Sequence, residues 1–217
     1  MQNKHRSALL LFLTAAIWGG TFIIVKGSLT VLTPMAVIAY RFTIAFLFLA
    51  FLYRRALARN WRPALGPGLG LGFILTLAFA TQTFGLKYTT PAVSALVTGL
   101  NGVFVALIET VFYRKKMTRP VLLGLLAATF GLILITWPTE RFTLDRGILL
   151  TLVCAILYAW HIVALGRAVA GADATTLTII QFAVVATVAW AFTPGGFPVA
   201  PQMDAKTWSA ILYLAIP

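Results

Sequence analysis

Eight aromatic or polar side chains lie within long apolar stretches of this chain, where a polar group is costly unless it has a partner, a water-filled cavity or a function. They are Trp18, Thr21, Arg41, Gln82, Asn101, Tyr158, His161 and Gln181. The set combines flat rings with amide, hydroxyl, imidazole and guanidinium groups, which enclose and orient small molecules in pockets. These residue types predict a non-catalytic binding site for a small polar or amphipathic substrate.

Three pairs among these residues are separated by the same interval of 140 positions. The pairs are Trp18 with Tyr158, Thr21 with His161, and Arg41 with Gln181. Residues three apart share a face of a helix, so Thr21 and His161 extend the faces that carry the two paired rings. We expect two related helices to direct these groups towards one centre. The alternative is that the two rings only pack.

The sequence is compatible with two roles for Arg41 and with two roles for His161. Arg41 lies seven residues into an apolar stretch, roughly 10 Å from its start at 1.5 Å per residue. Its guanidinium either tethers helices or faces the substrate. His161 is either neutral and hydrogen-bonded or a proton-coupling site, since imidazole changes charge between about pH 5 and 8. Asn101, which has glycines nearby, is expected to line a cavity, and Gln82 is expected near an outer vestibule.

Membrane-spanning helices are the elements that must position these side chains. A helix rises about 1.5 Å per residue and the hydrocarbon core is about 30 Å thick, so a stretch of roughly 20 apolar residues can cross it. Backbone amides cannot be solvated in lipid, and the stretches are too long for barrel strands, so each is predicted to be helical. The predicted spans are Ser7–Gly27, Pro34–Tyr53, Gly66–Leu86, Pro91–Phe112, Pro120–Trp137, Gly147–Val169, Ala174–Phe192 and a run that begins at Lys206.

The later spans repeat the earlier ones at the interval of the paired residues. Residues 1–138 are predicted to form a first repeat of five helices, and residues 139–217 an incomplete second repeat with two spans and part of a third. An odd number of spans per repeat inverts the second copy, an arrangement found in many secondary transporters. We therefore expect an all-α integral membrane protein with ten helices in the full protein, about seven and a half of them present here.

Composition and charge support a membrane location. The chain is 60% apolar and 10% charged, whereas ordinary soluble domains have roughly 25% charged residues. The net charge of +12 follows from basic connections, and eleven of the 17 Lys and Arg fall on the same side when the N-terminus is cytoplasmic. By the positive-inside rule this predicts a multi-pass inner-membrane protein with that orientation. The basic clusters are short and lack interleaved aromatic residues, so we expect no nucleic acid partner.

Motifs that would indicate an enzyme or a cofactor are absent from the sequence. It has no phosphate-binding loop, no H-E-x-x-H, no C-x-x-C and no G-x-S-x-G. The connections, among them Arg54–Pro63, are too short to contain a soluble catalytic domain. We predict that the protein is not an enzyme, uses no cofactor and binds no metal, which favours a gradient-driven carrier.

Three further features are predicted to be structural. Cys154 is the single cysteine and is expected to pack inside a span. Glu109 precedes Arg114 and Lys115, which favours an interfacial ion pair over a coupling carboxylate. The glycines of Gly66–Gly72 have a small-xxx-small spacing, which favours close helix packing over a gating hinge.

Several short motifs together resemble the EamA-type branch of the drug/metabolite transporter superfamily. The motifs are Ala16–Phe22, Tyr40–Phe42, Gln82–Pro91 and Thr98–Asn101, with Gly147 and Gln181–Phe182 in the second repeat. The resemblance covers nearly the whole chain. It implies ten helices in two inverted halves around a central cavity, both termini in the cytoplasm, and transport of amino acids or other small metabolites, often outward.

The sequence thus predicts a secondary transporter of a small polar or amphipathic metabolite, which works by alternating access in a bacterial inner membrane. The resemblance implies that it is an exporter of small metabolites such as amino acids. Its partners would be a small-molecule substrate and the lipid bilayer, and both a monomer and a homodimer are compatible with the pattern. The alternative is a non-transporting membrane scaffold or interaction module, or an inactive truncated fragment.

Overall fold

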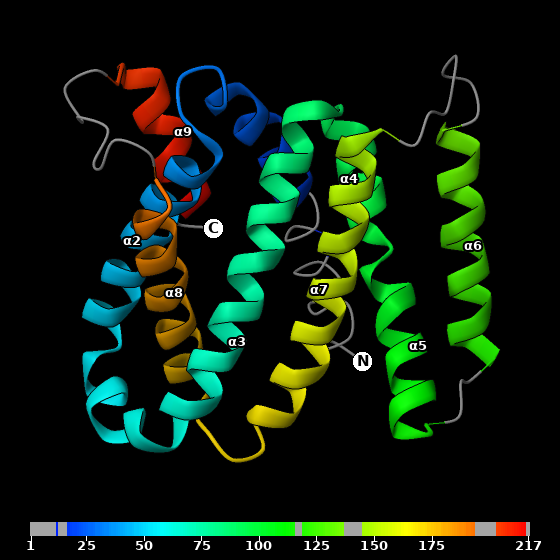
Figure 1. Ribbon diagram of the computed structural model, residues 1–217. Coiled ribbons are helices and arrows are strands. Elements are labelled where there is room, and N and C mark those ends of the chain that lie inside the picture. The colour runs from blue at the N-terminus through cyan, green and yellow to red at the C-terminus, as the bar shows by residue number, and fades with distance from the viewer. Residues whose placement is uncertain (1–11, 13–16, 116–118, 137–144, 194–202, 216–217) are drawn as a thin grey trace.

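The computed structural model describes residues 12, 17–115, 119–136, 145–193 and 203–215 (Figure 1). These residues form helices and connections, without a strand. Residues 17–28 form the first helical segment. The helices that follow are α2 (Pro34–Leu52), α3 (Arg54–Tyr88), α4 (Pro91–Gly99), α5 (Asn101–Tyr113), α6 (Arg119–Thr136), α7 (Arg146–Ala168), α8 (Ala174–Ala191) and α9 (Ala205–Ala215).

Five of these helical stretches are long and apolar enough to cross a membrane: Pro34–Leu52, Arg54–Tyr88, Pro91–Tyr113, Arg146–Ala168 and Ala174–Ala191. They agree with five of the predicted spans, and the predicted all-α membrane fold is confirmed. The predicted spans Ser7–Gly27 and Pro120–Trp137 lie partly outside the described residues. The run that begins at Lys206 contains α9, which has 11 residues. The inverted repeat stays a prediction.

The prediction that Arg54–Pro63 is a connection was wrong. α3 begins at Arg54 and continues for 35 residues, with Pro63 and Pro67 inside it. At 1.5 Å per residue α3 is about 52 Å long, well beyond the roughly 30 Å of hydrocarbon. The basic first turns of α3 can therefore extend out of the membrane and remain helical there, because helical backbone needs no apolar environment.

The fourth span is broken rather than continuous. α4 ends at Gly99 and α5 begins at Asn101. Between them the amide of Leu100 donates to the carbonyl of Val97 at 3.1 Å, a tighter turn than that of an α-helix. Gly99 and Gly102 border the break, and glycine lowers the helix preference on both sides. Irregular backbone at membrane depth is tolerated where it borders protein or a cavity.

α3 lies in the middle of the bundle and packs against both α7 and α8 (Figure 1). Glycines make these close approaches possible. A Cβ at Gly72 would lie 2.7 Å from Val184 Cβ, and one at Gly68 would lie 2.7 Å from Ile180 Cγ2. This pair supplies the small-xxx-small contact with α8, so the expected packing role is confirmed for Gly68 and Gly72, whereas a Cβ at Gly66 or Gly70 would meet nothing within 4 Å.

The ends of the helices are capped by short polar side chains and by one lysine. Asp145 Oδ1 accepts from the amide of Ile148 at 2.8 Å, and Asp173 Oδ2 accepts from that of Thr176 at 2.8 Å. The hydrogen bonds from Thr176 lower the pKa of Asp173 from its ordinary value.

At the C-terminal end of α3, Lys26 Nζ donates to three carbonyls, those of Leu86 at 2.7 Å, Lys87 at 3.1 Å and Thr89 at 2.9 Å. Lys26 thereby ties the first helical segment to the end of α3.

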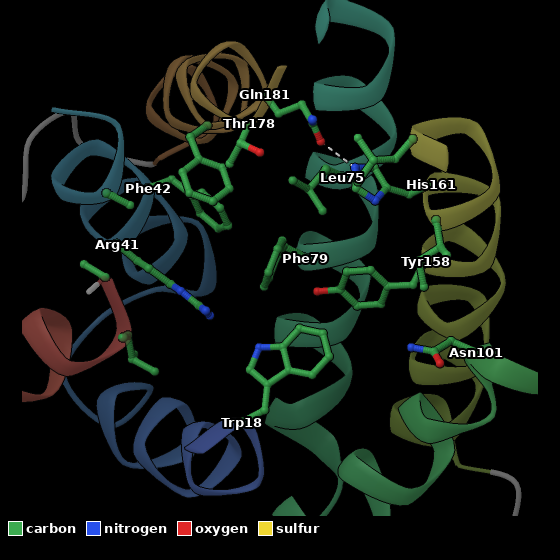
Figure 2. Close-up of a pocket in the computed structure, with 16 residues that line it drawn as sticks. Trp18, Arg41, Phe42, Leu75, Phe79, Asn101, Tyr158, His161, Thr178 and Gln181 are labelled. Carbon is green, nitrogen blue, oxygen red and sulfur yellow. Dashed lines mark hydrogen bonds between the residues drawn. The ribbon is translucent and has the colours of Figure 1, made fainter. Parts of the chain in front are cut away.

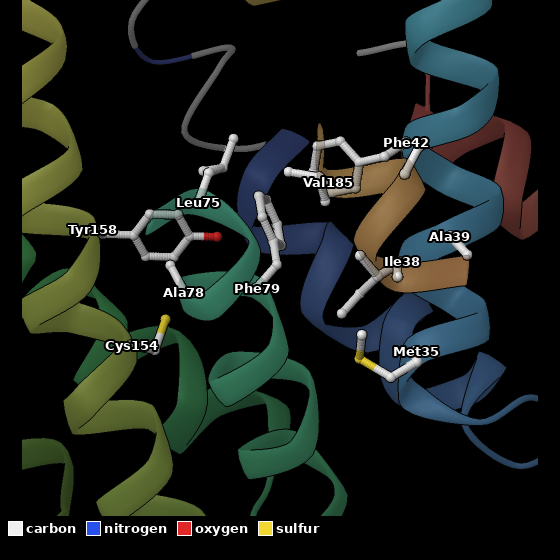
Figure 3. Close-up of a cluster of buried hydrophobic side chains, with 12 residues drawn as sticks. Met35, Ile38, Ala39, Phe42, Leu75, Ala78, Phe79, Cys154, Tyr158 and Val185 are labelled. Atoms are coloured by element: carbon white, nitrogen blue, oxygen red, sulfur yellow. The ribbon is translucent and has the colours of Figure 1, made fainter. Parts of the chain in front are cut away.

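The largest buried cluster joins α2, α3, α7 and α8, and it contains Phe42, Phe79, Tyr158 and Cys154 (Figure 3). Cys154 is fully buried, as predicted. Large apolar side chains are also exposed around the outside of the bundle; Phe51 is 72% exposed and Val111 67%. A soluble protein does not leave such an extensive apolar surface in water, so this surface fits contact with lipid.

The basic connections gather at one end of the bundle. The α2–α3 turn, the end of α5 and the α7–α8 connection all lie at the bottom of Figure 1. At this end Arg167 stacks on the ring of Tyr113, 3.3 Å from its centroid. Glu109 Oε1 and Lys115 Nζ are 2.6 Å apart, so the predicted ion pair of Glu109 is confirmed, with Lys115 as its partner.

Candidate functional site

Two adjoining cavities lie between the helices, one of about 360 Å³ and one of about 330 Å³. We call them the His161 lobe and the Gln82 lobe, after one polar residue of each. Five residues line both lobes: Trp18, Arg41, Phe79, Asn101 and Tyr158. The shared residues come from the first helical segment, α2, α3, α5 and α7, so the lobes form one continuous site at the centre of the bundle (Figure 2).

All eight residues that the sequence singled out line this site. Trp18, Arg41, Asn101, Tyr158, His161 and Gln181 line the His161 lobe. Thr21 and Gln82 line the Gln82 lobe with the shared residues. The three pairs separated by 140 positions are therefore distributed over the two adjoining lobes: Trp18, Tyr158 and Arg41 line both lobes, whereas Thr21 lines the Gln82 lobe and its partner His161 the His161 lobe.

In the His161 lobe, α7 and α8 are joined by a buried polar pair. His161 Nε2 and Gln181 Oε1 are 2.5 Å apart, and both side chains are buried (Figure 2). An amide oxygen only accepts, so Nε2 carries the hydrogen in this arrangement and Nδ1 accepts if the ring is neutral. His161 is therefore hydrogen-bonded, as one of the two roles named from the sequence requires.

In the Gln82 lobe, polar side chains form hydrogen bonds within their own helix or to a neighbouring one. Gln82 Nε2 donates to Thr98 Oγ1 at 3.3 Å and so links α3 to α4 next to the break in the fourth span. Thr21 is buried and donates to the carbonyl of Trp18 at 2.6 Å. The ring of Trp18 is 52% exposed and points into the cavity (Figure 2). It has free surface against which a ligand can stack.

Arg41 extends from α2 into the centre of the site (Figure 2). Its guanidinium carbon lies 5.1 Å from the ring centroid of Phe79 and 5.5 Å from that of Phe42. These are distances at which cations and aromatic rings attract each other. Within the described part of the chain the one ion pair is that of Glu109, so Arg41 has no carboxylate partner there.

Aromatic rings form a row along the site that the sequence analysis did not foresee as a unit. Phe182 of α8 meets Phe42 of α2 edge to face at 5.0 Å, Phe42 meets Phe79 of α3 at 4.7 Å, and Phe79 meets Tyr158 of α7 at 5.5 Å. Phe79 was missed because an aromatic residue in an apolar span carries no polar signal. The row gives the cavity a rigid apolar wall across four helices.

Among the described residues no group of His, Cys, Asp and Glu is arranged to hold a metal ion. The cavity offers hydrogen-bond donors, aromatic faces and one cation. It can enclose and orient a small molecule without a reactive nucleophile–base pair at its centre.

A match to a family model identifies the family of this chain. The model of the EamA-like transporter family matches residues 5–137, more than half of the chain. The chain belongs to the EamA-like transporter family. It is a multi-pass membrane transporter, in agreement with its spans and with the resemblance of its motifs. Membership also implies a small-molecule substrate and a lipid environment.

Relatives of this EamA-like transporter are themselves described as transporters. An uncharacterized transporter of Archaeoglobus fulgidus is 31% identical over 224 residues, which is 98% of this chain and 76% of the relative. The uncharacterized transporter YyaM of Bacillus subtilis is 28% identical over 137 residues, 61% of this chain and 45% of that protein. The chain thus spans about three quarters of the first relative and less than half of the second.

The fold also occurs among solved structures. One crystal structure superposes with a TM-score of 0.63 at 23% sequence identity, covering 97% of this chain and 74% of that one. At this identity the likeness concerns the fold of the EamA-like transporter and leaves its substrate open.

Proposed function

We propose that the protein is a secondary transporter that exports small metabolites such as amino acids by alternating access around the central cavity. One observation carries the proposal: the three residue pairs separated by 140 positions line the two adjoining lobes of the central site. A cavity to which both repeats contribute equivalent side chains is what transport between two inverted halves requires. The eight lining residues named from the sequence are proposed to bind the substrate.

The contact between α2 and α8 supports two related halves. Phe42 and Phe182 are separated by the same 140 positions and touch each other, with ring centroids 5.0 Å apart. In an arrangement with a two-fold axis, a residue that contacts its own equivalent lies on that axis. The α2–α8 contact is therefore proposed as the line about which the halves rock, with Arg41 and Gln181 beside it.

The orientation is proposed from the charges. The ends of α5 and α7 and the start of α3 are basic and lie at one end of the bundle (Figure 1). In bacterial inner membranes such an end faces the cytoplasm. This would place the N-terminus in the cytoplasm, with the His161 lobe on the cytoplasmic side of the Gln82 lobe.

Metabolite profiling tests the proposed export. The full chain would be expressed in a bacterial host that lacks its own metabolite exporters, and the medium compared with that of cells carrying an empty vector and cells expressing Trp18→Ala. We expect one or a few small metabolites to accumulate several-fold in the medium of the parent strain only. Dissipation of the proton gradient with an uncoupler should reduce that accumulation, because no ATP-binding motif is present in the sequence.

The same comparison tests the alternative that the protein is a non-transporting scaffold. Identical profiles for the parent and the empty vector, with equal amounts of folded protein in the membrane, would contradict export and favour a non-transporting scaffold.

A further inference from the structure

The cavity contains a cation that no carboxylate in the described part of the chain neutralises. Arg41 borders both lobes, and the described residues that line them include no Asp or Glu. The whole chain has five acidic residues. Four of them have other partners or capping roles: Glu109 with Lys115, Asp145 with Ile148, Asp173 with Thr176 and Asp204 with Thr207. The fifth, Glu140, lies in a connection outside the described residues.

The setting of Arg41 favours an anion as its partner. Arg41 as a whole is half-buried, and its guanidinium lies near the rings of Phe42 and Phe79, so aromatic contacts use its flat faces. Its N–H donors point outward in the plane of the group, where they match the two oxygens of a carboxylate. A charge withdrawn from water without a partner is costly, and a bound anion removes that cost.

The break in the fourth span borders the site opposite Arg41 (Figure 2). α5 has 13 residues and begins at Asn101, whose side chain lines both lobes. The N-terminus of a helix carries a partial positive charge, but here the C-terminal end of α4, which carries the opposite partial charge, is only one residue away. The sign of the cavity is therefore set by Arg41.

The rest of the wall combines polar side chains, among them His161, Gln181 and Gln82, with apolar and aromatic ones. Phe79 and Tyr158 meet edge to face, and the ring of Trp18 lies below them in Figure 2. A volume of about 360 Å³ for the larger lobe suits a molecule of the size of one aromatic ring with a short side chain.

We infer that the substrate is a small monocarboxylate with an apolar or aromatic body. Its carboxylate binds the guanidinium of Arg41, and its body lies against Trp18, Phe79 and Tyr158. Organic cations are excluded by the same charge. This inference rests on the proposed function and specifies the substrate class of that same site.

Three probes that differ only in the head group test the inference. Phenylacetate, phenylacetamide and phenethylamine carry the same ring with a negative, neutral and positive head. Their binding to the full chain in lipid nanodiscs is measured by equilibrium dialysis at neutral pH. We expect phenylacetate to bind at least about tenfold more tightly than phenethylamine.

Substitutions of Arg41 distinguish the effect of its charge from that of its forked donors on the preference for phenylacetate. Arg41→Gln should remove most of the preference for phenylacetate, whereas Arg41→Lys should keep part of it, because lysine retains the charge without the forked donors. Phenylacetamide should bind all three proteins with little change, which shows that the pocket is intact.

The substrate class is overturned if the parent binds phenethylamine as tightly as phenylacetate, if Arg41→Gln keeps the preference, or if none of the three probes binds. Each of these results leaves the proposed export to be decided by metabolite profiling, so the two proposals can fail separately.

Discussion

Gly85→Ala is expected to lower the free energy of unfolding by about 1–3 kcal/mol, the usual cost of an extra methyl group in a tightly packed interior. A Cβ at Gly85 would lie 2.7 Å from Thr151 Oγ1 and 2.9 Å from the carbonyl oxygen of Gly147. The Thr151 hydroxyl is held by its own bond to that carbonyl at 2.8 Å. Neither neighbour can yield unless α3 and α7 separate, and these two helices carry Phe79 and Tyr158 into the cavity.

Gly70→Ala is the matched control. Gly70 lies in the same helix, and a Cβ there meets nothing within 4 Å. Alanine is favoured over glycine in a helix by roughly 0.5–1 kcal/mol, so this variant should be as stable as the parent or slightly more so. Thermal unfolding of both variants in detergent, followed by a thiol- or tryptophan-based signal, makes the comparison. Equal melting temperatures for the two variants would show that the α3–α7 contact is looser than the structure indicates.

Trp18→Ala and His161→Ala should each reduce export of the metabolites found by profiling by about tenfold or more, because loss of one central contact commonly costs 1–3 kcal/mol of binding, to order of magnitude. Trp18 is 52% exposed within the protein and has few packing partners to lose. For Trp18→Ala the amount of folded protein should therefore fall much less than export does, whereas His161→Ala also removes a buried hydrogen bond to Gln181 and needs the correction for folded protein. Initial rates of efflux are measured and divided by the folded protein recovered from the membrane.

Cys154→Ala is the control for this pair of variants. Cys154 is fully buried in the core cluster and lines neither lobe. Its replacement should affect packing slightly and leave the normalised export near that of the parent. If Trp18→Ala and His161→Ala export like Cys154→Ala, the cavity residues do not bind the substrate.

The polar residues that line the two lobes were predictable because polar groups inside apolar spans stand out. Arg41, Asn101 and His161 each interrupt an apolar run, and the interval of 140 positions linked two of them to Gln181 and Thr21 before any geometry was available. What the spacing could not supply was the contact between His161 and Gln181, since it depends on how α7 and α8 rotate about their axes.

Phe79 and the extent of α3 were not predictable for physical reasons. Phe79 looks like any other aromatic residue facing lipid, and only the crossing of α3 with α2 and α7 places it beside Arg41. Proline and arginine at positions 54–63 are typical of a connection. Yet Pro63 lies inside a helix. At these positions the residue preferences for a connection were outweighed by the continuation of a helix whose later part is embedded in the membrane.

Access to the cavity from both sides of the membrane tests the central claim most directly. In a Cys154→Ala background, single cysteines would replace Ala45, which lines the His161 lobe, and Ala95, which lines the Gln82 lobe. Leu47→Cys is the control, because Leu47 is on α2 and exposed on the outside of the bundle. Each variant is treated with a charged, membrane-impermeant thiol reagent in intact cells and in inside-out vesicles. Alternating access around one cavity predicts that both cavity cysteines are labelled from both sides and Leu47→Cys from neither. Labelling of the cavity cysteines from one side only, or from neither, would contradict it.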